Sequence, residues 1–354
     1  MRAVPHAAFA AALLALACGE KPPPAPVVAL APAPDTLPTE FSEVTSGAWL
    51  GGDRWAILAA PDEKAAIADL AGRKVVPLGG AKELRNPATL FRTGDTLYVG
   101  DWGLRRTSRW TLEGRFAGAE PVSDALRGVL PRARDAAGQF YLEVSPRPGA
   151  DGRGNRDSAA VVRAAPGGAR ADTVARLAPL DIAEVMGDAG RRFERRVFSG
   201  ADQWGALPDG SVWVARVYDN RVDWRSSLGE WRRGQALPDR VLEVTRYDRE
   251  LFLRRFPPEL RGTAEQLPFA PVKPPFEAGV TSPTGEVWLE KSRAPADSSR
   301  RYHRVDRQGR LREEIRVPGR GRIVAVAPDA VLVAEPSRDG IRLLRFSLPH
   351  GVTE

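Results

Sequence analysis

The chain has 354 residues, of which 43% are apolar and 27% charged, with a formal net charge of +7. This apolar content is enough to bury a sizeable core and excludes global disorder. A single cysteine, Cys18, excludes an intramolecular disulfide and a cysteine-based zinc site. The three histidines form no H-E-x-x-H motif, so the sequence predicts no cofactor, no metal site and no catalytic residue.

The first 17 residues are predicted to be a signal peptide. Arg2 is followed by an apolar run from Ala7 to Ala17, which is too short for a membrane span of about 20 residues. A basic start, a short apolar run and small residues at its end are the layout of a secretory signal. The run ends in Leu14-Ala15-Leu16-Ala17-Cys18, which resembles the signal of bacterial lipoproteins.

That resemblance implies that Cys18 is lipidated and becomes the first residue of the mature protein. Gly19, rather than aspartate, implies an outer-membrane location in the cell envelope, facing the periplasm or the cell surface. The membrane is thus the first expected partner, through an N-terminal lipid anchor. The alternative is an ordinary signal peptide with an incidental cysteine.

Residues 18–38 are predicted to be a proline- and alanine-rich tether. The segment contains Lys21-Pro22-Pro23-Pro24-Ala25-Pro26 and further prolines up to Pro38. Such a composition disfavours helices and sheet ladders and favours polyproline II. At about 3.1 Å per residue, it could hold a domain up to roughly 55 Å from the bilayer.

Residues 39–354 contain a repeat. A turn pair precedes an apolar-aromatic-apolar triplet, for example in Gly94-Asp95-Thr96-Leu97-Tyr98-Val99 and Pro208-Asp209-Gly210-Ser211-Val212-Trp213-Val214. The triplet centres are Ala56, Tyr98, Tyr141, Trp213, Trp288 and Leu332, with spacings of 42, 43, 72, 75 and 44 residues. A period near 42 with four strands per unit is the signature of a β-propeller blade, and the two long spacings indicate insertions.

The sequence resembles six-bladed propellers of the NHL and TolB-like kind. The resemblance is carried by Leu97-Tyr98-Val99-Gly100-Asp101, by Asn220-Arg221-Val222-Asp223-Trp224, and by Lys273-Pro274-Pro275-Phe276 ahead of Val287-Trp288. It implies an all-β fold with six four-stranded antiparallel blades, and it is nearly silent on function.

Two further elements are expected. The last blade lacks an outer strand, and Thr39 to Thr45 is predicted to supply it and so close the ring. Thr245-Arg246-Tyr247-Asp248 fits the start of a capping box, which predicts one short helix from Arg246 to Phe256, ended by Pro257-Pro258.

Three long segments are expected to leave the propeller on one face, which we call the insertion face. They span residues 146–158, 178–201 and 237–276. Insertions gathered on one face commonly mark the binding face. The candidate ligand-binding residues there are Trp102, Arg147, Arg153, Arg156, Arg191, Arg192, Arg195 and Arg196.

The arginines favour an anionic partner, either a ligand or an acidic protein of the envelope, because guanidinium groups bind carboxylates and phosphates. The alternative is a solvated face, since Glu184, Asp188 and Glu194 dilute the same segment. Nucleic acid is not expected as a partner of an exported protein.

The remaining candidates are assigned structural roles. Five side chains of the repeated strand are predicted to pack between blades: Trp55, Tyr98, Tyr141, Trp213 and Trp288. Trp224 and Trp231 are also read as structural, and His303 as a surface or inter-strand residue.

Asp101, Glu143, Glu290 and Glu335 stand near strand ends, as in propeller lactonases that hold a metal, but their alternating offsets predict that they do not converge. The favoured function is therefore a lipid-anchored binding or scaffolding module outside the cytoplasm. The alternatives are a metal-dependent, lactonase-like hydrolase on the same scaffold and a purely structural envelope protein.

Overall fold

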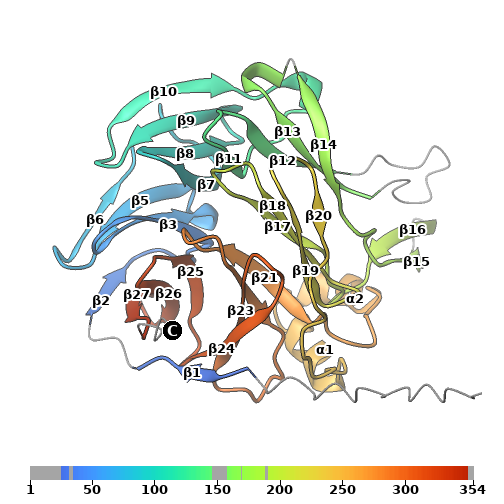
Figure 1. Ribbon diagram of the computed structural model, residues 1–354. Coiled ribbons are helices and arrows are strands. Elements are labelled where there is room, and N and C mark those ends of the chain that lie inside the picture. The colour runs from blue at the N-terminus through green and yellow to red at the C-terminus, as the bar shows by residue number, and fades with distance from the viewer. Residues whose placement is uncertain (1–24, 32–34, 146–157, 169, 188–189, 350–354) are drawn as a thin grey trace, which may run out of the picture.

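Short strands separated by tight turns form six sheets around a central channel in the computed structural model (Figure 1). The structure describes residues 25–31, 35–145, 158–168, 170–187 and 190–349. The predicted six-bladed propeller is confirmed. The predicted signal peptide and Cys18 lie outside the described residues.

In each of the first four blades, the strands run outward from the channel in chain order and pair antiparallel. Blade 1 consists of β3 (Ser46–Gly51), β4 (Arg54–Ala59), β5 (Lys64–Asp69) and β6 (Lys74–Pro77). Blade 2 consists of β7 (Pro87–Thr93), β8 (Thr96–Asp101), β9 (Arg106–Thr111) and β10 (Phe116–Pro121). Blade 3 consists of β11 (Ala133–Arg134), β12 (Phe140–Val144), β13 (Ala160–Ala164) and β14 (Ala171–Arg176). Blade 4 consists of β17 (Gln203–Ala206), β18 (Val212–Arg216), β19 (Arg221–Arg225) and β20 (Trp231–Arg232).

The last two blades each take one strand from the start of the chain. Blade 5 consists of β21 (Phe276–Thr281), β22 (Val287–Lys291), β23 (Arg300–Val305) and β24 (Leu311–Val317), with β1 (Val27–Ala29) added parallel to β24. Blade 6 consists of β25 (Arg322–Val326), β26 (Ala330–Ser337) and β27 (Gly340–Ser347), with β2 (Asp35–Thr39) as its fourth strand. The predicted triplets all lie in the second strand of their blade.

Ring closure by an N-terminal strand is confirmed, but the strand lies earlier than the predicted Thr39 to Thr45. Asp35 pairs with Arg345 and Thr39 with Ile341, whereas the backbone N–H of Thr45 donates to Leu58 O (2.8 Å), leading into blade 1. Pro38 is compatible with β2 because this strand lies at a sheet edge, where a missing N–H can face solvent.

The predicted tether is also corrected in its second half, because β1 lies within residues 18–38 and β2 begins there. The backbone N–H of Leu30 donates to Arg316 O (3.0 Å), and its side chain is buried against the core between blades 5 and 6. The high proline content of this segment argued against strands. β1 and β2 form nevertheless, because they pair with β24 and β27.

Two insertions lie between blades on the insertion face. The first is a hairpin of β15 (Ile182–Gly187) and β16 (Gly190–Arg195), and the second contains α1 (Arg246–Leu253) and α2 (Pro258–Glu265). The Thr245/Asp248 capping box is confirmed. The predicted single helix is corrected to two, because Pro258 occupies the first turn of a second helix, where proline is tolerated. Neither α-helix in the described part of the chain reaches the length and apolarity of a membrane span.

Aromatic side chains hold the two insertions together. Phe198, which follows the hairpin, lies 5.9 Å (ring centroids) from Phe252 of α1, and Phe252 lies 5.6 Å from Phe269. A buried ion pair between Asp248 and Lys273 (2.6 Å) adds a polar contact beside them. Three short 3-10 turns complete the fold, at Ala60–Asp62, Asp124–Leu126 and Pro166–Gly168.

The predicted packing of aromatic residues between blades is confirmed. The Tyr141 hydroxyl of blade 3 lies within hydrogen-bond distance of Asp135 Oδ2 (3.0 Å) and of Gly210 O of blade 4 (3.3 Å), and Trp213 of blade 4 donates its indole N–H to Thr281 Oγ1 of blade 5 (2.9 Å). Trp55, Tyr98 and Trp288 are also buried between blades, but the indole nitrogens of Trp55 and Trp288 have no hydrogen-bond partner among the described residues. Trp224 is buried as well and donates to Asp306 O (3.1 Å), whereas Trp231 is exposed.

Gly279 on β21 tests this packing. A Cβ placed there would lie 2.7 Å from Cη2 of the Trp213 ring, which its hydrogen bond to Thr281 holds in place. We expect Gly279→Ala to destabilise the fold by about 1–3 kcal/mol through overpacking, measured by urea unfolding.

Gly262→Ala in α2 is the matched control. Its Cβ would meet open space, so a neutral change or a gain of about 0.5–1 kcal/mol is expected. Equal losses in both variants would contradict the proposed role of the aromatic contact.

Candidate functional site

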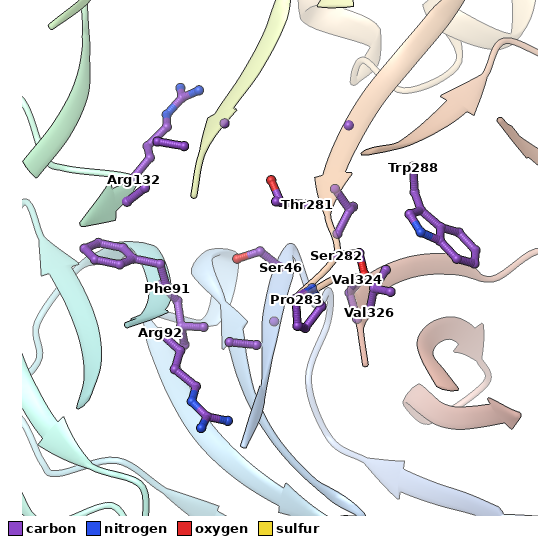
Figure 2. Close-up of a pocket in the computed structure, with 18 of the residues that line it drawn as sticks. Ser46, Phe91, Arg92, Arg132, Thr281, Ser282, Pro283, Trp288, Val324 and Val326 are labelled. Atoms are coloured by element: carbon purple, nitrogen blue, oxygen red, sulfur yellow. The ribbon is translucent and has the colours of Figure 1, made fainter. Parts of the chain in front are cut away.

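The central channel holds a cavity of about 690 Å³ that is lined by the innermost strands of all six blades. Small side chains and glycines, such as Gly47, Ala133, Gly205 and Gly279, keep it open. In Figure 2, Phe91 and Arg132 lie on one side of the opening and Thr281 and Ser282 on the other, with Ser46 between them. A cavity of this size is in the range of small-molecule sites.

The charged side chains that line this cavity are four arginines and one glutamate. They are Arg92, Arg132, Arg134, Arg322 and Glu290. Glu290 is buried and already accepts hydrogen bonds from Arg300 and from Arg322 (3.1 Å). Arg132 pairs with Glu143 (3.1 Å) and lies over the Trp204 ring. The charged side chains of the channel wall therefore carry a net positive charge.

Arg92 and Arg134 are held differently. They stand at the ends of β7 and β11, near the face opposite the insertions, which we call the turn face. Arg92 donates to Trp49 O and Gly94 O (both 2.8 Å). Arg134 donates to Gly138 O (3.2 Å) and to the Tyr98 hydroxyl. Neither forms an ion pair with a described residue, so these two guanidinium groups are fixed in place without a carboxylate partner.

The hairpin arginines are in part neutralised by their own neighbours. Ion pairs join Arg191 to Glu184 (2.7 Å), Arg192 to Glu194 (3.1 Å) and Arg196 to Asp181 (3.2 Å). Arg195 instead donates to Ser199 Oγ (3.2 Å) and Ser199 O (2.9 Å). The hairpin does gather the four arginines in space, but three of them already have a carboxylate partner.

The other candidates are spread around the ring. Trp102 lies in the loop after β8, on the insertion face, and is 48% exposed, so it remains available for contact. Arg147, Arg153 and Arg156 lie outside the described residues. The structure brings neither Trp102 nor the hairpin arginines to the wall of the cavity.

The four carboxylates considered as metal ligands each form hydrogen bonds or ion pairs with groups close to them in the fold. Asp101 accepts from the backbone N–H groups of Arg85, Asn86 and Leu104 at 2.7–3.0 Å. Glu143 accepts from the Trp204 indole (2.7 Å), and Glu335 pairs with Arg342. Within the described ranges, no three His, Cys, Asp or Glu side chains gather closely enough to hold a metal ion.

His303 lies on β23 between two neighbouring strands and is buried. Of the two predicted positions, the inter-strand one is therefore correct and the surface one is wrong. Burial lowers its pKa to about 3, and the cations Lys291 and Arg301 add to this effect. Burial likewise lowers the pKa of Lys291 to about 8, against the opposing effect of Asp239 at 3.4 Å. Both groups lie beside blade 4, away from the channel cavity.

The fold and the site together define a six-bladed propeller with an arginine-lined channel. No family model and no curated protein matches the sequence. Solved structures with a similar fold include regucalcin, a calcium-binding protein from Agrobacterium tumefaciens, at 11% identity over 92% of this chain and 97% of that chain, with a TM-score of 0.46.

A duf4221 family member from Bacteroides vulgatus is 11% identical over 89% of this chain and 96% of that chain, with a TM-score of 0.49. Virginiamycin B lyase from Staphylococcus aureus is 9% identical over 89% and 98%, with a TM-score of 0.46. Likenesses at this level carry no argument about what this chain binds.

His303 predicts an acid-dependent loss of stability. Its pKa in the folded chain is about 3, against an ordinary value of 6.5, so between these pH values the unfolded chain binds a proton that the folded chain does not. Stability therefore falls as the pH falls below about 6, by up to about 1.4 kcal/mol per pH unit. His303→Leu is expected to remove this part of the slope in denaturant titrations between neutral and acidic pH. Parallel curves for the two proteins would contradict the assignment.

Proposed function

We propose that this protein is a lipid-anchored envelope protein whose propeller channel binds a small anionic ligand. The observation that carries the proposal is the charge of the cavity wall. Four arginines line the cavity of about 690 Å³, and the single carboxylate that lines it among the described residues is already bound by two arginines. An anion in the channel would supply the partner that Arg92 and Arg134 lack among the described residues.

The physical chemistry of the wall supports this choice of ligand. Main-chain carbonyls hold Arg92 and Arg134 in place, so little side-chain entropy would be lost on binding. The walls between them are largely apolar and backbone-lined, which focuses the field of the guanidinium groups into the channel. Carboxylates and phosphates suit guanidinium forks, and the volume suits a ligand of drug-like size.

The anchor and the location are part of the same proposal. They are supported by the sequence Leu14-Ala15-Leu16-Ala17-Cys18 and by Gly19, which resemble a lipoprotein signal directed to the outer membrane. The likeness to NHL and TolB-like propellers belongs here as well, since it rests on the sequence motifs. Mass spectrometry of the mature N-terminus tests the anchor directly.

The channel is tested with defined anions. Inorganic phosphate, citrate and an oligogalacturonate would each be titrated while the melting temperature is followed. A ligand at about 100 times its Kd stabilises the fold by about 2.7 kcal/mol. We expect at least one of these probes to raise Tm in the native protein, and the double variant R92Q/R134Q to lose about tenfold or more in affinity, equivalent to about 1.4 kcal/mol.

The hairpin supplies the matched control. The variant with Arg191, Arg192, Arg195 and Arg196 changed to alanine removes more charge than R92Q/R134Q but is expected to keep the binding. Loss of binding in the hairpin variant alone would move the site to the insertion face. Failure of every anion to stabilise the native protein would remove the channel proposal, and a rise in Tm with Ca²⁺ would favour a metal-dependent function instead.

A further inference from the structure

The N-terminal segment lies on the outer edge of blade 5 as a fifth strand. In β1, Val27 pairs with Glu314 and Ala29 with Arg316, parallel to β24. The backbone N–H of Glu314 donates to Pro26 O (2.9 Å), and that of Leu30 donates to Arg316 O (3.0 Å). Figure 1 shows β1 beside β24 at the rim of the ring, with β10 of blade 2 at the far side. The chain is therefore attached to the propeller from Pro26 onward.

This attachment shortens the length of chain available between an anchor at Cys18 and the domain. Eight residue steps separate Cys18 from Pro26. Even fully extended, they span at most about 29 Å. A ring with four strands on each side of its channel is wider than this, since strands are spaced at about 4.8 Å. An anchor at Cys18 therefore keeps blade 5 close to the bilayer and blade 2 away from it.

The same edge carries a surplus of arginine. Arg310 and Arg312 share Asp306, and Arg301 and Arg316 share Glu314. The side chains of Arg310, Arg312 and Arg316 are 51%, 58% and 52% exposed. Arg304 of β23 pairs with Glu313 of β24 (3.0 Å), so this edge holds five arginines and three carboxylates, and such an excess attracts an anionic lipid surface.

We propose that the outer edge of blade 5, made of β1, β24 and the turn before β24, is the membrane-facing surface of the propeller. The partner is the anionic headgroup layer of the bilayer that holds the lipid anchor. This inference rests on the anchor at Cys18 in the proposed function and is independent of what the channel binds. It sets the channel axis along the membrane, so that both mouths stay open to the surrounding solution.

Two single-cysteine variants test the orientation. Cys18 is the sole cysteine of the chain, so once it is lipidated an introduced cysteine is the one free thiol. Gln308→Cys places a fluorophore in the exposed turn before β24, and Ala117→Cys places one on the exposed β10 of blade 2. The full acylated protein is put into phosphatidylethanolamine–phosphatidylglycerol vesicles that contain headgroup spin-labelled lipid. We expect several-fold stronger quenching at position 308 than at position 117.

A release variant makes the test independent of the labels. Leu30→Asp places a charge at the buried end of β1 and is expected to free the segment up to β2, so that the contrast between the two labels shrinks while the protein still sediments with the vesicles. Val28→Pro, which removes the N–H of the central β1 residue, serves the same purpose if Leu30→Asp unfolds the protein.

The outcomes separate the two proposals. Equal quenching at both labels, or stronger quenching at 117, in a protein with acylated Cys18 overturns the orientation and leaves the anchor intact. A mature protein without acyl chains at Cys18 overturns the anchor and the orientation with it. Anion binding in the channel is unaffected by either result.

Discussion

The ring depends on the aromatic side chain at the centre of the second strand in four of the six blades. Each ring packs in the gap between two blades, where burial favours a hydrogen-bond partner for its polar atom. Trp288 is the exception, because its indole nitrogen is buried without a partner among the described residues. Trp213 finds Thr281 of the next blade, and Tyr141 finds Gly210. These contacts tie neighbouring sheets together at the level of the second strand.

The same contact shapes the channel. Because Trp213 reaches across to blade 5, the backbone beside it must carry no side chain, and glycine stands at positions 205 and 279. The innermost strands therefore present small residues to the axis and leave the space open. Arginine side chains stand at the strand ends, where Arg92 and Arg134 donate to main-chain carbonyls of nearby turns and of the neighbouring strand β3. The cavity and its charge thus follow from how the blades are spaced.

The sequence predicts the repeated parts of this structure well and the unrepeated parts poorly. The Gly-Asp turn and the triplet around Tyr98 recur with a period, so the second strands and the blade count could be read directly. Arg92 and Arg134 sit in first strands, which carry no such signal, and their role depends on which strands border the axis. An arginine close to the turn between the first and second strands of a blade, as in Arg92-Thr93-Gly94 and Arg134-Asp135, is the sequence signal that could have identified them.

The hairpin shows the opposite limit. Its arginines are conspicuous in the sequence, but three of them pair with carboxylates of the same hairpin: Glu184 on the facing strand, Glu194 on the arginines' own strand and Asp181 at the hairpin base. The N-terminal strands show a third limit. β2 joins Thr39 to Ile341 across 302 residues of chain, and only a complete blade 6 gives it a partner. The proline-rich composition argues locally against a strand. The pairing with β27 that overrides it joins residues that are 302 positions apart. Contacts of such separation form late, because the loop entropy must be overcome first. The same holds for β1, whose partner strand β24 lies almost as far along the chain. β1 and β2 are thus specified by blades 5 and 6 rather than by their own residues.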